Sequence, residues 1–180
     1  MHSFSTGTHE LRKVLIPQNR LQERVSELGL EISQAYEGKD LALIAILKGS
    51  FVFAADLLRA MTIPCSIDFM SISSYVSQPG SGVVQITKDL DESIADRNVI
   101  LVEDIIDTGL TANYLMNNLK RRGPASVELC ALLDKSARRI IELPIAYRGF
   151  EIPDVFVVGY GMDYQQNYRN LPDIAILRQE

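Results

Sequence analysis

The sequence lacks the excess of basic residues that a nucleic-acid-binding protein normally carries. Its 180 residues contain 18 Lys and Arg against 23 Asp and Glu, so the net charge at pH 7 is −5. The sequence pI is about 5.1. Because nucleic acid is usually held by a basic face, we expect no nucleic-acid partner. The composition leaves room for a local basic pocket that binds a phosphorylated small molecule.

Cysteine is also scarce, and long apolar runs are absent. Cys65 and Cys130 are far apart and form no CxxC pair, so we expect free thiols rather than a disulfide. The first residues, MHSFSTGTHE, have neither the basic nor the apolar region of a signal peptide. No apolar run reaches the ~18 residues that a membrane span needs. These absences predict a cytoplasmic protein with no membrane partner.

No internal repeat, low-complexity tract or Pro/Gly-rich linker divides the chain. With 47% hydrophobic and 23% charged residues, the composition is that of an ordinary globular protein. The length is sufficient for one domain with a sizeable core. We therefore predict a single domain over residues 1–180.

Hydrophobic periodicity predicts strands that alternate with helices. Residues 18–37 place apolar side chains at three- and four-residue spacing, which is typical of an amphipathic helix, and Gly38 ends it. Residues 41–47, LALIAIL, form a continuous apolar run typical of a strand covered on both faces. The other expected elements are helices at 51–60 and 111–121 and strands at 65–72, 98–103, 126–133 and 154–158. This order predicts an α/β fold with a doubly wound parallel sheet.

Ligands of such sheets bind beyond the carboxyl ends of the strands. That rule gathers four parts of the chain at one rim: Lys48, Glu103 to Thr111, Lys135, and Gly159 to Asp163. The segment 73–87 has a different character, because it is rich in Ser, Gly and Pro. We predict a mobile loop or loosely paired hairpin there, and loops of this length often act as lids.

One stretch at this rim, NVILVEDIIDTGLT (98–111), joins carboxylates to a Gly/Thr turn. The first N–H groups of a helix have no internal partner and favour an anion, so a helix after Gly109 can cradle a phosphate. Simple capping by Asp107 or Thr108 is the alternative. Capping leaves Glu103 and Asp104 unexplained, whereas the hydroxyls of a sugar phosphate would donate to both carboxylates. The stretch therefore favours a ribose-phosphate site.

Two other kinds of phosphate site are not expected. No GxxxxGK[ST] pattern is present, which argues against a nucleoside-triphosphate loop. The GYG at 159–161 does not extend to GxGxxG, which weakens a dinucleotide-binding fold.

VILVEDIIDTGLT closely resembles the phosphoribosyl pyrophosphate motif of type I phosphoribosyltransferases. Similarity to the hypoxanthine-guanine branch of that family extends, in order, over LKGS (47–50), SSY (73–75), LLDK (132–135), GFEIPDVFVVGYGMDY (149–164) and YRNLP (168–172). The resemblance covers the chain from about Leu41 onward and implies a small hood formed by the N- and C-terminal segments. Two departures occur, Leu110 where some members carry Lys, and LKGS in place of LKGG. Both positions can act through backbone groups.

The resemblance also implies roles for individual residues. Asp107 would face N7 of a purine base and accept its proton, while the phosphoribosyl group would be bound by Glu103, Asp104, Asp107, Thr108, Gly109, Leu110 and Thr111. Pyrophosphate would be bound by Lys48, Gly49, Ser74, Tyr75 and Arg169, with a cis Leu47–Lys48 peptide. The purine would be bound by Lys135, Phe156, Val157 and Asp163. Without the resemblance, the two lysines, Asp163 and Arg169 are ordinary surface residues, and Phe156 and Val157 are core residues.

The implied reaction is Mg²⁺-dependent and converts phosphoribosyl pyrophosphate and hypoxanthine or guanine into the nucleoside monophosphate and pyrophosphate. The metal would be bound by Glu103, Asp104 and Asp163, partly through substrate or water, and residues 73–87 would form the lid. A homodimer or homotetramer is expected.

Three competing interpretations stay open: a non-catalytic regulator on the same fold, a phosphoribosyltransferase for xanthine, adenine or a pyrimidine, and a nucleotide-binding protein without chemistry. Lys135, Phe156 and VVGYGMDY favour 6-oxopurines. We expect the runs Lys120–Arg122 and Arg138–Arg139 to be solvated surface.

Overall fold

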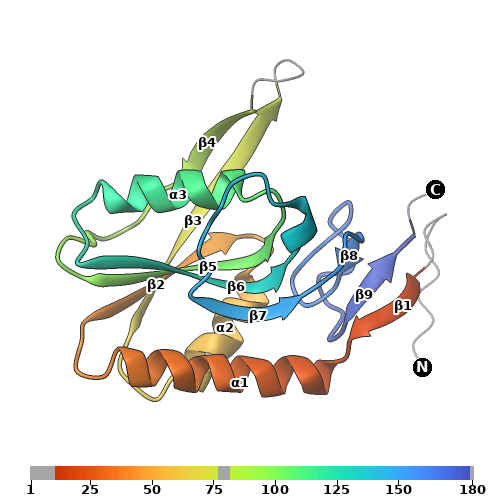
Figure 1. Ribbon diagram of the computed structural model, residues 1–180, viewed down its shortest axis with the longest axis horizontal. Coiled ribbons are helices and arrows are strands. Elements are labelled where there is room, and N and C mark those ends of the chain that lie inside the picture. Colours follow the sequence, from red (N-terminus) through yellow and green to blue (C-terminus); the bar gives the residue numbers. More distant parts are fainter. Residues whose placement is uncertain (1–10, 77–81, 179–180) are drawn as a thin grey trace.

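The computed structural model describes residues 11–76 and 82–178, which form two sheets and three α-helices (Figure 1). The larger sheet has six strands in the order β4-β3-β2-β5-β6-β7. All neighbours in it are parallel except β3 and β4. The strands are β2 (Leu41–Leu47), β3 (Ser66–Val76), β4 (Gly82–Lys88), β5 (Asn98–Ile106), β6 (Ser126–Asp134) and β7 (Tyr147–Glu151). The α/β fold predicted from the sequence is confirmed.

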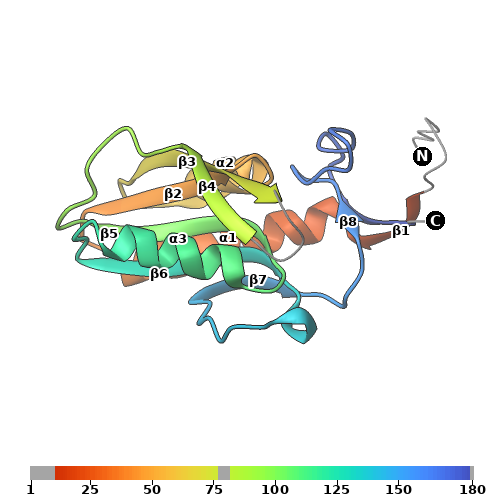
Figure 2. The same cartoon turned by 90° about the horizontal axis from the view of Figure 1, so that it is seen from above.

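The buried strands divide their side chains between two cores, one on each face of the sheet. In β2, Leu41, Leu43 and Ala45 join one core, while Ala42, Ile44 and Ile46 join the other. The first core lies under α1 (Gln18–Ala35) and α2 (Phe51–Ala60), and the second lies under α3 (Leu110–Lys120) (Figures 1 and 2). Two-sided burial explains why β2 is a continuous apolar run rather than an alternating one.

Helix α1 buries the stripe that its sequence predicted, with Leu21, Val25, Leu28 and Ile32 almost fully buried. It ends at Ala35, two residues before the predicted end, and Gly38 follows with a left-handed φ of 74°. A β-carbon on Gly29 would overlap Ala60, so this glycine lets α1 and α2 pack closely. No helix of the described residues is long and apolar enough to cross a membrane. Cys65 and Cys130 are both free, as expected.

The second sheet is the hood that the family resemblance implied. It joins β1 (Leu11–Ile16), β9 (Ile174–Leu177) and β8 (Val157–Val158), with β9 in the centre and antiparallel to both neighbours. Both ends of the described chain therefore lie together at one end of the molecule (Figures 1 and 2).

Two predictions about the strands were wrong. The strand expected at 154–158 in the parallel sheet is only Val157–Val158, and it belongs to the hood. The edge strand of the parallel sheet is instead β7, which the apolar pattern did not predict because YRGFE lacks one. Gly149 permits this pairing, since a β-carbon there would overlap the carbonyl oxygen of Leu132.

Strands β3 and β4 form an antiparallel hairpin that projects from the sheet (Figure 1). Its ladder runs from Ser71 paired with Lys88 to Val76 paired with Gly82. The predicted lid segment 73–87 lies on this hairpin, except for its tip, 77–81, which is outside the described residues. The hairpin is paired; its action as a lid stays a prediction.

Candidate active site

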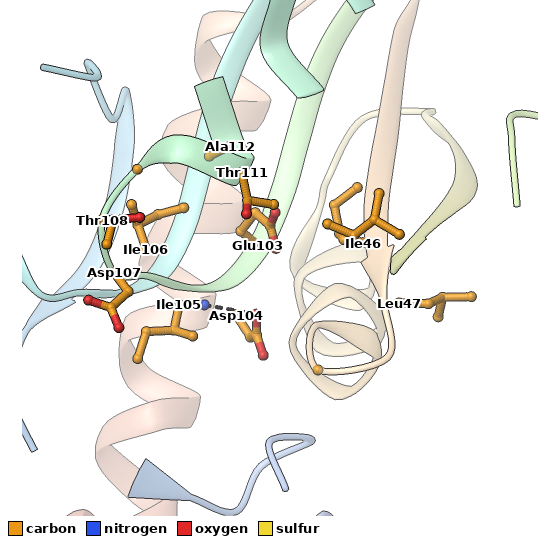
Figure 3. Close-up of a pocket in the computed structure, with 13 residues that line it drawn as sticks. Ile46, Leu47, Glu103, Asp104, Ile105, Ile106, Asp107, Thr108, Thr111 and Ala112 are labelled. Atoms are coloured by element: carbon orange, nitrogen blue, oxygen red, sulfur yellow. Dashed lines mark hydrogen bonds between the residues drawn. The ribbon is translucent and has the colours of Figure 1, made fainter. Parts of the chain in front are cut away.

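Two adjoining cavities lie where the parallel strands end. The smaller, about 300 Å³, is lined by β5 and by the turn that leads into α3 (Figure 3). The larger, about 590 Å³, reaches across to Lys135, Phe156 and Arg169. Asp104, Ile105 and Asp107 line both. The C-terminal end of β5 therefore stands between the two cavities.

Glu103 and Asp104 belong to β5, which runs three residues beyond its predicted end. Their side chains leave the strand on opposite sides, with Glu103 directed toward the first turn of α3 (Figure 3). Burial, together with the neighbouring Asp104, raises the pKa of Glu103 well above its usual value. Burial also raises the pKa of Asp104 to about 6, against the opposing effect of the Ile105 N–H, which donates to Oδ1 at 2.9 Å. Such carboxylates suit partners that donate hydrogen bonds or carry positive charge.

The turn after β5 has the geometry of an anion cradle. Gly109 precedes α3 with φ of 85°, and no side chain caps the helix. The Leu110 N–H donates only a long hydrogen bond, of 3.4 Å, to Thr108 Oγ1. The capping interpretation of Asp107 is therefore wrong, because its carboxylate faces Arg138 instead, with Oδ1 3.1 Å from Nε. Because the hydrogen bond from Leu110 to Thr108 is long and weak, an anion can replace it at the first N–H groups of α3.

The Lys48-Gly49 turn closes the other side of both cavities. The Leu47–Lys48 peptide is cis, as the resemblance implied. A β-carbon on Gly49 would overlap the Asp104 carboxylate, and one on Gly161 would overlap the Gly49 carbonyl. The turn is therefore packed directly between β5 and the hood loop, which is the segment 159–173 between β8 and β9. The side chains of Ser74 and Tyr75, also predicted here, are outside what the structure describes.

Arg169 connects the hood loop to this site. Its guanidinium lies 2.7 Å from Asp163 Oδ1 and donates to the Gly161 carbonyl, also at 2.7 Å. Arg169 and Asp163 both line the larger cavity, beside Lys48. The predicted pyrophosphate residues Lys48, Gly49 and Arg169 are thus brought together.

The predicted purine residues line the far side of the larger cavity. Lys135 is buried, with 8% of its side chain exposed, and its Nζ is 3.9 Å from Asp154. Phe156 is 36% exposed and meets the Tyr164 ring edge to face at 5.6 Å. The core interpretation is therefore wrong for Phe156 but correct for Val157, which is 6% exposed. An accessible aromatic face beside a buried lysine suits a flat base with a polar edge.

The predicted metal residues do not form a cage of protein ligands. Within residues 11–76 and 82–178, no three His, Cys, Asp or Glu side chains converge on a point that could hold a metal. Asp104 and Asp163 line the larger cavity, whereas Glu103 lines only the smaller. Their oxygen donors fit Mg²⁺, which commonly keeps water and binds substrate oxygens with few protein ligands.

Several contacts were missed by the sequence reasoning. Arg138 is exposed, as expected, but it also pairs with Asp107. Arg139 is not solvated surface, because it pairs with the buried Asp134 and its Cδ packs against Gly109. The signal was present in LLDKSARR, because charged residues that follow a buried strand directly lie at the ligand rim. Tyr160 was also missed; its hydroxyl donates to Asp56 at 2.6 Å and ties the hood loop to α2.

The fold and these cavities define a phosphoribosyltransferase. The family model of the phosphoribosyl transferase domain matches residues 17–165, so the chain belongs to the phosphoribosyltransferase family. It is 46% identical to the hypoxanthine-guanine phosphoribosyltransferase of Dictyostelium discoideum over 94% of this chain and 97% of that one. It is also 46% identical to the hypoxanthine phosphoribosyltransferase of Escherichia coli, over 91% of this chain and 93% of that one.

A crystal structure of a hypoxanthine-guanine phosphoribosyltransferase from Bacillus anthracis, with HEPES in its active site, superposes with a TM-score of 0.90. That match has 46% identity and covers 96% of this chain and 100% of the other. Within its family, the chain is an enzyme of the hypoxanthine-guanine branch, which acts in purine salvage.

Proposed function

We propose that the chain transfers the 5-phosphoribosyl group from phosphoribosyl pyrophosphate to N9 of hypoxanthine or guanine, giving IMP or GMP and pyrophosphate. The observation that carries this proposal is the position of Asp107. It lies on the wall between an open helix N-terminus and the cavity that holds Lys135 and Phe156. A sugar phosphate and a purine can therefore meet at one carboxylate.

The smaller cavity suits the phosphoribosyl group. The N–H groups of Gly109, Leu110 and Thr111, with the hydroxyls of Thr108 and Thr111, would hold the 5-phosphate. Glu103 and Asp104 would accept hydrogen bonds from the ribose hydroxyls. Their negative charge would also favour positive charge that develops on the ribose as its bond to pyrophosphate breaks.

The Lys48-Gly49 turn, Arg169, Ser74 and Tyr75 would bind pyrophosphate. Arginine and lysine donors suit phosphate oxygens, and Arg169 already lines the larger cavity. The metal would be held by Glu103, Asp104 and Asp163, in part through water or substrate. Mg²⁺ supplies positive charge that stabilises the leaving pyrophosphate.

The purine would lie in the larger cavity, with its face on Phe156, its O6 near Lys135, and its other edge near Val157 and Asp163. As N9 bonds to C1′, the bond from C1′ to the pyrophosphate oxygen breaks and pyrophosphate keeps the electron pair. The proton on N7 then passes to the Asp107 carboxylate, so the product base is neutral. Lys135 as an O6 donor favours 6-oxopurines over adenine.

Replacing Asp107 by Asn tests this assignment. Because Asn has nearly the same size but cannot accept the N7 proton, Asp107→Asn should lower kcat on the order of 10²-fold or more. Both KM values should change far less. Asp96→Asn, at an exposed position outside both cavities, is the matched control. A proportional change in kcat and KM would count against the proton-acceptor role.

A spectrophotometric assay tests the substrate. Enzyme, Mg²⁺ and phosphoribosyl pyrophosphate are mixed with hypoxanthine, guanine, xanthine, adenine or a pyrimidine in turn. Product with the first two bases is expected. No product with any purine would refute the proposal and leave a non-catalytic regulator or nucleotide-binding protein. The predicted cytoplasmic location, the single domain and the homodimer or homotetramer stay predictions.

A further inference from the structure

Four charged side chains of alternating sign form a series beside the larger cavity, which three of them, Asp107, Arg138 and Lys135, line. Two of the four, Arg138 and Asp154, have no role in the reaction described above. Arg138 Nε is 3.1 Å from Asp107 Oδ1, and Arg138 Nη1 is 3.4 Å from Asp154 Oδ1. Lys135 Nζ lies 3.9 Å from the same oxygen of Asp154. The order is therefore Asp107, Arg138, Asp154, Lys135. The series begins and ends on the two groups that would meet N7 and O6 of the purine.

The backbone fixes this arrangement from both sides. Arg138 ends a 3₁₀ turn, Ser136–Arg138, directly after Lys135. The Lys135 N–H donates to the Ile106 carbonyl at 2.9 Å, and the Ile140 N–H donates to the Thr108 carbonyl at 2.9 Å. The segment that carries Arg138 is therefore hydrogen-bonded at both ends to residues that flank Asp107. Its guanidinium has a defined place at the cavity wall.

The contact between Arg138 and Asp107 leaves hydrogen-bonding capacity free. Oδ1 of Asp107 is shielded from solvent and has no hydrogen-bond donor among the described residues, although Arg138 Nε is 3.1 Å away. The ion pair attracts the carboxylate without a hydrogen bond to that oxygen. A shielded acceptor without a donor is costly, and an N–H of a ligand that reaches the Asp107 carboxylate would remove that cost.

We propose that Arg138 and Asp154 form a charge bridge that positions Asp107 and Lys135 for the N7/O6 edge of the purine. The bridge rests on the proposed function, because it acts through the proton acceptor. Without purine, Asp154 holds the Lys135 ammonium and Arg138 holds the Asp107 carboxylate. When the purine binds, its O6 takes Lys135 and its N7–H reaches Asp107, while Arg138 and Asp154 keep each other as partners.

This role differs from a contribution to stability. Arg138, Asp107 and Asp154 have 48%, 42% and 53% of their side chains exposed, and exposed ion pairs stabilise proteins little. Loss of Arg138 should therefore leave the melting temperature nearly unchanged. The loss should be seen in turnover, because a carboxylate that is free to rotate spends less time facing N7.

A double-mutant cycle tests the bridge. Arg138→Met is made in the wild type and in Asp107→Asn, and kcat is measured with hypoxanthine at saturating phosphoribosyl pyrophosphate. In the wild type we expect kcat to fall on the order of tenfold, part of what a positioned general base contributes. In the Asp107→Asn background we expect less than about a twofold further loss, because residues that act together are not additive. Arg138→Lys should restore part of the activity.

The control is Arg121→Met, an exposed arginine just after α3 that lines neither cavity, and it should change nothing. For the other end of the bridge, Asp154→Asn should raise KM for hypoxanthine and leave KM for phosphoribosyl pyrophosphate unchanged. An equal loss from Arg138→Met in both backgrounds, or no loss in either, would overturn the bridge. Full activity of Asp107→Asn alone would refute the proton acceptor itself, so the two failures are distinguishable.

Discussion

At the scale of single residues, Gly49 shows how contact rather than backbone conformation can require glycine. Its φ is not left-handed, so alanine would not be strained there for conformational reasons. A β-carbon would nevertheless overlap the Asp104 carboxylate. The glycine therefore lets the Lys48-Gly49 turn and the end of β5 share one cavity wall.

Gly49→Ala should displace Asp104 or the turn and lower kcat/KM for phosphoribosyl pyrophosphate. A misplacement of about 1 Å in a catalytic site can cost on the order of 10²-fold. Gly38→Ala is the opposite case, since its φ is 74° but a β-carbon there would meet no other part of the chain within 4 Å. It should reduce the melting temperature slightly and leave kcat/KM unchanged. Equal kinetics for Gly49→Ala and wild type would contradict the close-contact argument.

The acids and the turn in NVILVEDIIDTGLT could be predicted because they are contiguous and each follows from local chemistry. The role of Arg138 could not, because it depends on a 3₁₀ turn that places one arginine beside residues 31 and 16 positions away. The same holds for Asp56 and Tyr160, which are 104 residues apart. Long-range pairs between polar residues leave no periodic signal in the sequence.

At the scale of elements, the hairpin of β3 and β4 stands beside the cavities, and Ile72 of β3 lines both. The buried central strands were predicted well where both of their faces are apolar, in LALIAIL (41–47) and VILV (99–102), whereas the end of β5 beyond Glu103 was missed. The edge strand β7 and the hood strand β8 were not predicted well. Both are short, and they pair through backbone hydrogen bonds that leave no pattern in the side chains.

Replacing residues 77–81 by Asn-Gly tests the lid. The two-residue turn suits an antiparallel hairpin, so Val76 and Gly82 can stay paired and the fold should melt at the wild-type temperature. Nucleotide formation should fall, and hydrolysis of phosphoribosyl pyrophosphate by water should rise, because a shortened hairpin cannot exclude solvent. A five-residue Gly/Ser replacement of the same segment keeps the length and serves as the control. Unchanged nucleotide yield from the shortened variant would rule out a lid.

At the scale of the whole molecule, the two buried acids of β5, Glu103 and Asp104, oppose the stability of the fold. Because burial raises the pKa values of Glu103 and Asp104, the folded state binds their protons more tightly than the unfolded state. For Asp104 the effect develops over the pH range between its usual pKa of 3.8 and its folded pKa of about 6. Over this pH range the free energy of unfolding falls as pH rises. The loss of stability is complete once the pH exceeds the folded pKa values of both acids.

Glu103→Gln removes one of these charges without changing the size of the side chain. In substrate-free enzyme at pH 8 it should raise the melting temperature by a few degrees, and the gain should shrink at pH 5, where Glu103 is already protonated more often. Glu37→Gln, at an exposed position, should have no such pH-dependent effect. Mg²⁺ with phosphoribosyl pyrophosphate should stabilise the wild type more than Glu103→Gln, because the ligand compensates the buried charge. A variant that melts below the wild type at pH 8 would mean that Glu103 serves the fold rather than the substrate.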